Sequence, residues 1–244
     1  MKTLKNWSLT HSDQHHVALT VDGKYQLNLF VLESGMFRVS IKRQSGYALD
    51  RTWSIAPDSD VPWEGRPRDS LAGFTLPGFT LEEEGDTLVV STDVLRVIVH
   101  QPLALEWQHR DSAGAWQLLT CDRPTSAYLI NAHGDGVAHY QRRMNDDAYY
   151  GLGEKTGDLQ RNGKRYEMRN LDAMGYNASS TDPLYKHVPF TITRRSDVSF
   201  GLYYDNLSSS WFDLGNELDN YHQPYRRWQA ESGDIDYYLF VGSK

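Results

Sequence analysis

The sequence has almost no cysteine and no long apolar run. Cys121 is the single cysteine among 244 residues, which excludes an intramolecular disulfide framework and favours a reducing compartment. No apolar stretch approaches the roughly 20 residues that a membrane-spanning helix needs. Residues 1–16 contain no apolar core of signal-peptide length. We therefore expect a soluble, cytoplasmic protein without a membrane partner.

An excess of basic residues is also lacking. Lysine and arginine number 25 against 32 aspartate and glutamate residues, a formal net charge of −7. Nucleic-acid modules usually carry a basic face, so we expect no nucleic-acid partner. Disorder is excluded because 39% of the residues are hydrophobic and 12% are aromatic, enough to build a core.

Helical periodicity is the third thing missing. No stretch of about 11 residues or more keeps the apolar spacing of a helix face. Instead, polar and apolar residues alternate over 25–31 and 37–41, as in half-buried strands. Asp22-Gly23 favours a type I′ hairpin turn, in which both residues need positive φ. Further strand candidates are 88–92, 94–99, 103–109, 116–119, 188–193, 200–204 and 235–241. The pattern predicts an all-β fold, an antiparallel two-sheet β-sandwich.

Two segments interrupt the strand pattern. Residues 56–71 are rich in proline and charge and should form a surface loop. Residues 154–187 are longer, with three glycines, many charges and little periodicity. Long irregular stretches inside compact domains are uncommon and are often functional when ordered. A functional site is therefore expected in the loop at 154–187.

Simple nucleotide and metal motifs do not account for a function. Gly151–Gly157 misses the G-x-G-x-x-G spacing by one residue, and no helical pattern follows, so a phosphate-binding loop is rejected. Three histidines near the N-terminus match no known ligand spacing and have no thiolate beside them: His11, His15 and His16. We expect them to be surface residues, with no metal site and no cofactor.

Two further candidates for chemistry have ordinary explanations. Cys121 lies in no nucleophile motif and should be a small buried residue. Asp234 and Asp236 share one strand face, and paired carboxylates can carry out acid–base chemistry. Their place at the start of a strand instead predicts solvent-exposed charges.

The segment Asp172–Tyr185 concentrates groups that suit a sugar. It contains carboxylates, an amide and hydroxyls, which can pair with vicinal sugar hydroxyls, together with two tyrosines whose flat faces suit a pyranose ring. A polar composition is nevertheless also the ordinary composition of a loop. The residues themselves leave both interpretations open.

Several motifs in order resemble those of glycoside hydrolase family 31, which contains α-glucosidases and α-xylosidases. They are YYGLGEKTGDLQRNGKRYEMRNLDA (149–173), TDPLYKHVPF (181–190), FDLGNELDNYHQPYR (212–226) and GDIDYYLFVG (233–242). The resemblance is dense over 149–242 and looser over 37–142. It implies the family's N-terminal β-sandwich domain, of galactose-mutarotase-like fold, as a single domain over 1–244.

The resemblance also implies that the catalytic residues lie elsewhere. Family members are retaining enzymes whose aspartate nucleophile and aspartic general acid stand on a (β/α)8 barrel after this domain. A retaining pair lies roughly 5–5.5 Å apart across the scissile bond, and nothing here resembles the nucleophile motif. The chain ends at Lys244, about where the barrel begins in the family. We therefore expect the barrel to be absent and the segment alone to be inactive.

Site residues follow from the resemblance as well. In the family, a loop of this domain supplies an aspartate to the substrate-binding subsite nearest the scissile bond, and Asp172 matches that position. Thr181 and Asp182 are weaker substrate-binding candidates, since loop length varies there. Tyr149–Glu154 and Asp219-Asn220-Tyr221 are expected to hold the loop base and the domain interface. The expected ligand is an α-glucoside or α-xyloside, bound together with the barrel.

Two alternatives remain open. An aldose-1-epimerase would share the fold but uses a histidine acid and a glutamate base, and no stretch of this chain matches those motifs. A mutarotation assay on the isolated chain separates it. A stand-alone carbohydrate-binding module would need an exposed aromatic platform, and calorimetry with glycans separates that alternative.

Overall fold

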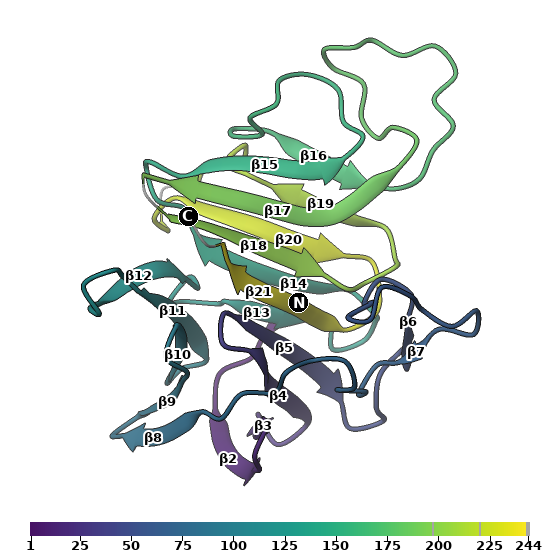
Figure 1. Cartoon of the computed structure of the whole chain (residues 1–244). Helices are drawn as coiled ribbons and strands as arrows, with labels where there is room; N and C mark the ends of the chain where they lie inside the picture. Colours follow the sequence, from purple (N-terminus) through teal and green to yellow (C-terminus); the bar gives the residue numbers. More distant parts are fainter. Residues whose placement is uncertain (197, 220, 243–244) are drawn as a thin grey trace.

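The computed structural model describes residues 1–196, 198–219 and 221–242, and every regular element in them is a β-strand. The strands form two large packed sheets, a smaller third sheet and a short ribbon (Figure 1). The described residues contain no helix of the length and hydropathy that would span a bilayer. The predicted all-β, antiparallel sandwich is confirmed, and the two smaller sheets extend it.

The larger layer is an eight-stranded antiparallel sheet. Its strand order is β15 (Ala148–Gly153), β17 (His187–Arg195), β18 (Val198–Tyr204), β21 (Ile235–Val241), β5 (Met36–Arg43), β4 (Tyr25–Glu33), β3 (His16–Val21) and β2 (Trp7–Ser12). The β3–β4 hairpin turns at Asp22 and Gly23, whose φ values of 49° and 66° confirm the predicted positive-φ turn.

The second layer is a six-stranded sheet, accompanied by a five-stranded one. The six-stranded order is β1 (Lys2–Thr3), β13 (Tyr128–Ile130), β14 (Val137–Arg142), β20 (Tyr225–Ala230), β19 (Ser210–Asp213) and β16 (Arg165–Met168). The five-stranded order is β12 (Trp116–Cys121), β11 (Ala104–Arg110), β10 (Leu95–His100), β9 (Thr87–Ser91) and β8 (Thr80–Glu84). β6 (Arg51–Thr52) and β7 (Arg66–Pro67) pair as a short ribbon, and β7 lies within the expected loop at 56–71.

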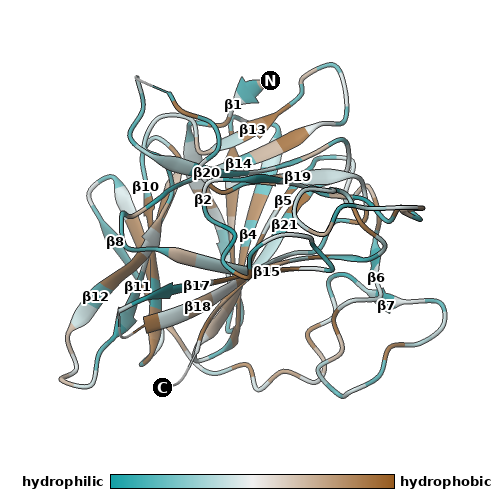
Figure 2. Ribbon diagram, turned by 90° about the horizontal axis from the view of Figure 1, so that it is seen from above, coloured by the Kyte–Doolittle hydropathy of each residue, from teal (hydrophilic) through white to brown (hydrophobic). Residues whose placement is uncertain are grey.

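The hydrophobic core lies between the sheets and is built from the apolar residues that alternate with polar ones along the strands. Phe37, Val39 and Ile41 of β5 are at most 1% exposed and face this core, because successive strand side chains point to opposite faces. Figure 2 shows hydrophobic residues alternating with hydrophilic ones along the central strands. Cys121 is buried at the end of β12, as predicted.

Buried ion pairs lie on the face of the eight-stranded sheet that points away from the core. Arg38 of β5 donates to both carboxylate oxygens of Asp236 on β21, at 2.8 and 2.7 Å. Residues 51–76 cover this face and are called the covering segment. Arg68 of this segment donates to Asp236 at 2.8 Å and to Asp205 at 2.9 Å. All four side chains are at most 5% exposed. We call this group, Arg38, Arg68, Asp205 and Asp236, the buried ion network.

The prediction that Asp234 and Asp236 are both solvent-exposed was wrong. Asp236 is completely buried, and Asp234 is half-buried with its carboxylate accepting the Ala48 N–H at 2.7 Å. Burial opposes ionisation of Asp236, but the Arg38 and Arg68 guanidinium groups outweigh it and lower the pKa of this carboxyl. The carboxylate is therefore a structural anion.

Replacing Asp236 with alanine should destabilise the fold severely. Arg38 would remain buried without its carboxylate, and removing one partner of a buried pair typically costs about 3–5 kcal/mol. Urea denaturation followed by tryptophan fluorescence measures the free energy of unfolding. Because its folded pKa is lowered, Asp236 stabilises the fold above the ordinary aspartate pKa, and this contribution disappears as the pH falls through the lowered value.

Asp69→Ala is the matched control. The Asp69 side chain is 57% exposed, lies 3.7 Å from Lys42 Nζ and accepts the Tyr47 hydroxyl at 2.9 Å. Both contacts are open to solvent, so the loss of Asp69 should cost about 1 kcal/mol. Similar losses for Asp236→Ala and Asp69→Ala would contradict the importance of the buried ion network.

Candidate functional site

The predicted functional loop lies where the edges of the two large layers meet. β15 and β17 pair at one edge of the eight-stranded sheet, and β16 is the edge strand of the six-stranded sheet. The expected loop at 154–187 is therefore divided by β16 into two pieces, 154–164 and 169–186. Both pieces project away from the body of the molecule (Figure 1).

An ion pair ties the two pieces together at their base. Lys155 Nζ lies 2.8 Å from Asp182 Oδ1, and the Lys155 side chain is completely buried while that of Asp182 is 20% exposed. Lys155 also donates to the Glu167 carbonyl of β16. Burial lowers the pKa of Lys155, and the hydrogen bond to Asp182 opposes this shift. Asp182 Oδ2 accepts the Glu167 N–H at 2.5 Å, so both carboxylate oxygens have partners within the chain.

Hydrogen bonds extend this base toward the tip. Thr156 Oγ1 donates to the Thr181 carbonyl at 2.6 Å, and the Gly157 N–H donates to the Ala178 carbonyl at 2.8 Å. The Thr181 hydroxyl accepts the Asn177 N–H at 2.8 Å and closes a tight turn at 177–181. These bonds fix the course of the second piece against the first.

Asp172 occupies a different position, near the exposed part of the second piece. Its side chain is exposed, and within the described residues its carboxylate makes no hydrogen bond or ion pair. The adjacent Ala173 is buried, and its carbonyl accepts the Tyr185 hydroxyl at 2.9 Å. Tyr185 in turn meets Tyr176 edge to face, with ring centroids 6.2 Å apart. The backbone beside Asp172 is thus anchored while the carboxylate itself is free.

A groove of about 660 Å³ runs beside the loop on the outer face of the eight-stranded sheet. Its lining is mainly apolar, with polar groups from the loop end of β17, and includes Phe74, Asn170, His187, Phe190, Tyr203 and Phe240. Asn170 Oδ1 accepts the His187 N–H at 3.2 Å, which joins the loop to the groove wall. Burial and then the nearby Lys155 charge lower the pKa of His187, so its imidazole is neutral at neutral pH.

Strand β17 explains why this groove was not predicted. The alternation located the strand correctly but suggests that its apolar residues face the core. In fact Thr191 and Thr193 are buried, whereas Val188 and Ile192 are 46% and 40% exposed. Arg226 from the second layer donates to Thr193 Oγ1 at 2.9 Å, which gives the buried hydroxyl its partner. The signal in the sequence was a strand with one apolar side and one threonine side, because β-branched threonines can also be buried when their hydroxyls have partners.

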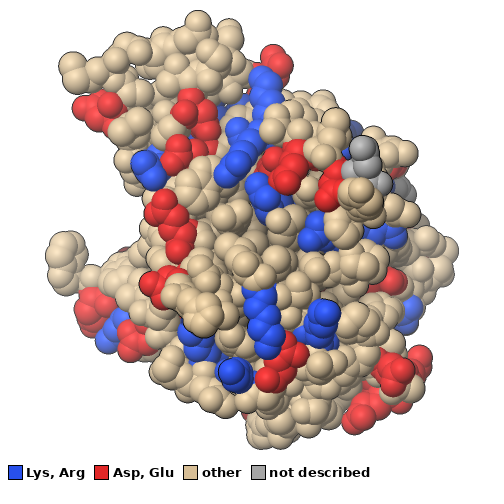
Figure 3. Space-filling model, turned by 180° about the vertical axis from the view of Figure 1, so that it is seen from behind, with Lys and Arg blue, Asp and Glu red and all other residues tan. Residues whose placement is uncertain are grey.

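The predicted site residues do not form one cluster. Thr181 and Asp182 lie at the loop base, and among the described residues neither forms a hydrogen bond or ion pair with Asp172. Figure 3, seen from behind, shows the loop as a projection at the upper left, largely uncharged at its tip, with acidic and basic side chains where it joins the body. Of the expected interface residues Asp219-Asn220-Tyr221, Asn220 lies outside the described residues, and Tyr221 is 95% exposed.

Comparison with known protein families identifies the family of this chain. Residues 26–213 match the model of the glycosyl hydrolase 31 N-terminal galactose mutarotase-like domain. The chain belongs to glycoside hydrolase family 31. The resemblance seen in the sequence motifs is therefore confirmed, and so is the galactose-mutarotase-like sandwich.

Curated relatives match over part of the chain. Alpha-glucosidase 2 of Bacillus thermoamyloliquefaciens is 38% identical over 102 residues, covering 41% of this chain and 12% of the relative. The alpha-glucosidase of Saccharolobus solfataricus is 42% identical over 94 residues, covering 38% of this chain and 13% of the relative. The alpha-xylosidase XylQ of Lactiplantibacillus pentosus is 24% identical over 144 residues, 58% of this chain and 17% of the relative. The matches thus span about an eighth to a sixth of these proteins.

Solved structures agree on the fold. The GH31 dextranase of Flavobacterium johnsoniae, complexed with glucose, superimposes with a TM-score of 0.80 and 24% identity, covering all of this chain and 27% of the dextranase. At that identity the likeness supports the fold alone. The 244 residues thus correspond to about a quarter of the dextranase chain.

Asp182→Ala should loosen the loop base. The substitution removes the carboxylate that pairs with the fully buried Lys155 side chain and that accepts the Glu167 N–H. Since Asp182 is partly exposed, we expect a loss of about 1–3 kcal/mol. Hydrogen exchange should become faster at the Gly157 and Glu167 amides and stay unchanged in β4.

Asp158→Ala serves as the control, because this exposed aspartate has no side-chain hydrogen bond or ion pair to a described residue. If Asp182→Ala and Asp158→Ala show the same exchange at Glu167, the ion pair does not hold the loop.

Proposed function

We propose that this chain is the non-catalytic N-terminal domain of a retaining α-glycosidase that hydrolyses terminal α-linked sugars. Its loop contributes a substrate-binding carboxylate, and its body supports a catalytic barrel. The observation that carries the proposal is the free, exposed Asp172 carboxylate on a backbone anchored at Ala173. The relatives named alpha-glucosidase and alpha-xylosidase support an α-glucoside or α-xyloside as substrate. The single buried cysteine supports the cytoplasm as the compartment.

The loop geometry supports a binding role for Asp172. A carboxylate has about four lone-pair sites and can accept hydrogen bonds from two neighbouring sugar hydroxyls. The anchored neighbours limit the conformational entropy lost on binding, and such pre-organisation favours affinity. Thr181 and Asp182 make their contacts within the loop, so we propose that they contribute to substrate binding by holding the loop in place.

The apolar groove is the proposed seat of the barrel. Val188 and Leu207 line the groove and are 46% and 60% exposed, and Ile192 exposes further apolar surface on β17. Contiguous exposed apolar surface of this kind marks an interface. The curated relatives are six to eight times longer than the matched segments, so family members carry much additional chain. A barrel seated on this face would also lie against the loop that carries Asp172, since Asn170 lines the groove.

The proposal is tested with Asp172→Ala in a complete protein that joins this chain to its barrel. Losing one charged hydrogen bond costs about 1.5–3 kcal/mol, so we expect kcat/KM for an α-glucoside to fall roughly 10- to 150-fold. Steady-state kinetics of the wild-type protein, Asp172→Ala and the control Asp158→Ala provides the measurement.

Asp158→Ala is the matched control, because it removes an exposed carboxylate from the other piece of the same loop. Its kinetics should equal those of the wild type. Unchanged turnover and affinity in Asp172→Ala would refute the assignment of this residue.

A specific observation also favours a second function, glycan binding by the chain itself. Trp63 is 96% exposed and Trp53 is 45% exposed, and both line one surface hollow of about 810 Å³. Trp53 Nε1 donates to the Trp63 carbonyl at 3.0 Å, which joins the two residues. Flat, exposed indole rings are the aromatic platform that a carbohydrate-binding module needs.

Calorimetry with an α-linked gluco-oligosaccharide tests this second function. If Trp53 and Trp63 form a platform, the isolated chain should bind saturably, and Trp63→Ala should weaken binding roughly tenfold or more. Tyr221→Ala, which removes another almost fully exposed aromatic ring, should leave the affinity unchanged. Absence of saturable binding by the wild-type chain would eliminate this function and leave the first proposal untouched.

A further inference from the structure

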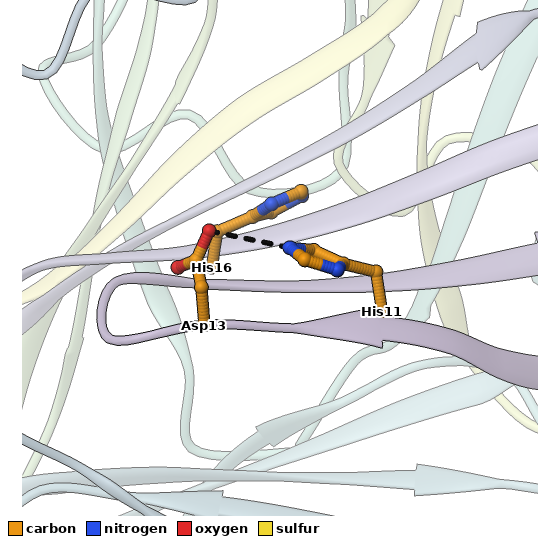
Figure 4. Close-up of side chains that lie close together, drawn as sticks. All are labelled: His11, Asp13 and His16. Carbon is orange, nitrogen blue, oxygen red and sulfur yellow. Dashed lines mark hydrogen bonds and ion pairs between the residues drawn. The ribbon is translucent and has the colours of Figure 1, made fainter.

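Two histidines and an aspartate meet at the connection between β2 and β3. His11 lies in β2, Asp13 in the turn, and His16 begins β3 (Figure 4). One potential ligand atom from each residue lies within 4.8 Å of the other two. This edge of the eight-stranded sheet is the opposite one from β15, so the group is separate from the loop that carries Asp172.

A β-bulge brings the two histidines to the same face. Leu9 pairs with Leu19, but the next pair is His11 with Ala18, so Thr10 is the extra residue. Without the bulge, His11 would pair with Val17, whose side chain is completely buried in the core. Side chains alternate between faces, so the extra residue turns His11 outward. Bulges commonly re-aim a side chain in this way.

His16 is held in a defined orientation. Its Nε2 lies 2.8 Å from Asn28 Oδ1, and Asn28 Nδ2 donates to Ser40 Oγ at 3.4 Å. With the amide oxygen facing the ring, Nε2 carries the proton and Nδ1 keeps its lone pair. The ring also stacks on Phe30, with centroids 4.6 Å apart.

Asp13 is oriented by the turn. Its Oδ1 accepts the His15 N–H at 2.8 Å, which leaves Oδ2 facing His11 Nε2 at 3.4 Å. Zinc bonds to nitrogen and oxygen are about 2.0–2.2 Å long, so two ligands of a tetrahedral ion are about 3.3–3.5 Å apart. The separation between His11 and Asp13 already matches that edge of a tetrahedron.

We propose that His11, Asp13 and His16 form a binding site for one divalent transition-metal ion of the zinc class. Two imidazole nitrogens with one carboxylate oxygen favour Zn²⁺, Co²⁺ or Ni²⁺ over Ca²⁺ and Mg²⁺, which select oxygen ligands. Three protein ligands leave the fourth position of a tetrahedral ion to water, because His11 and Asp13 are open to solvent. Asn28 acts as a positioning residue through its contact with His16.

The sequence alone predicts no metal here, and the structure shows why the site escapes detection. The spacing His-x-Asp-x-x-His belongs to no familiar ligand motif, and on an unbulged strand His11 would point toward the core. The ordinary alternative is a surface ion pair between His11 and Asp13, worth at most about 1 kcal/mol. That alternative does not account for the fixed ring of His16, and it predicts no saturable metal binding.

Titration calorimetry with Zn²⁺ on residues 1–244 tests the site. We expect one ion per chain, and a more than tenfold loss of affinity in His11→Ala and in His16→Ala. His11 is exposed, so its variant keeps the fold, which thermal unfolding without metal verifies. His15→Ala is the matched control, because only its backbone N–H contacts Asp13, and its affinity should stay within about twofold of the wild type.

Cobalt spectroscopy and Asn28→Ala provide independent readouts. Co²⁺ at this site should show the intense visible absorption of a tetrahedral ion, and His11→Ala should abolish it. Asn28→Ala should weaken Zn²⁺ binding roughly tenfold without changing the stoichiometry. No saturable Zn²⁺ binding, or equal losses in His11→Ala and His15→Ala, would overturn the proposal. A weak octahedral Co²⁺ spectrum would do the same.

Discussion

The buried ion pair between Arg38 and Asp236 is the constraint on which the covering segment and the groove both depend. Burying two charges costs several kcal/mol per ion, and only close pairing offsets that cost. Asp236 sits between Arg38 on the neighbouring strand and Arg68 on the covering segment, with distances of 2.7 to 2.8 Å. The covering segment therefore cannot leave the sheet without exposing a network that is stable only when closed.

This constraint also shapes the groove. Arg68 binds Asp205 as well, at the end of β18, and the residues just beyond Asp205 line the groove. The second wall comes from the loop, whose base is fixed by the buried Lys155–Asp182 pair. Two ion pairs, far apart in the sequence, thus hold the two walls of one apolar surface. Between these margins, apolar packing completes the groove, because Phe74, Tyr203 and Phe240 of its lining pack against the buried Phe30 and Tyr238.

The sequence predicts this fold well where the information is local. Alternation identified the strands around 25–31 and 37–41, and Asp22-Gly23 identified a hairpin, because each depends on neighbouring residues only. The strand β16 inside the expected loop was missed, since its four residues gain stability from pairing with the distant β19. The buried state of Asp236 had a signal, because Tyr238 and Phe240 share its face and imply a covered surface.

The site was predictable only in part, because the state of each carboxylate depends on contacts with residues that are distant in the sequence. Sequence motifs point to Asp172 and, more weakly, to Thr181 and Asp182, yet they cannot tell a carboxylate with partners from a free one. Asp182 uses both oxygens within the chain, whereas Asp172 uses neither among the described residues. Asp13 is intermediate, with one oxygen fixed by the backbone and the other facing His11. An anchored carboxylate with an oxygen to spare can bind a ligand, and one whose oxygens are all engaged holds the fold.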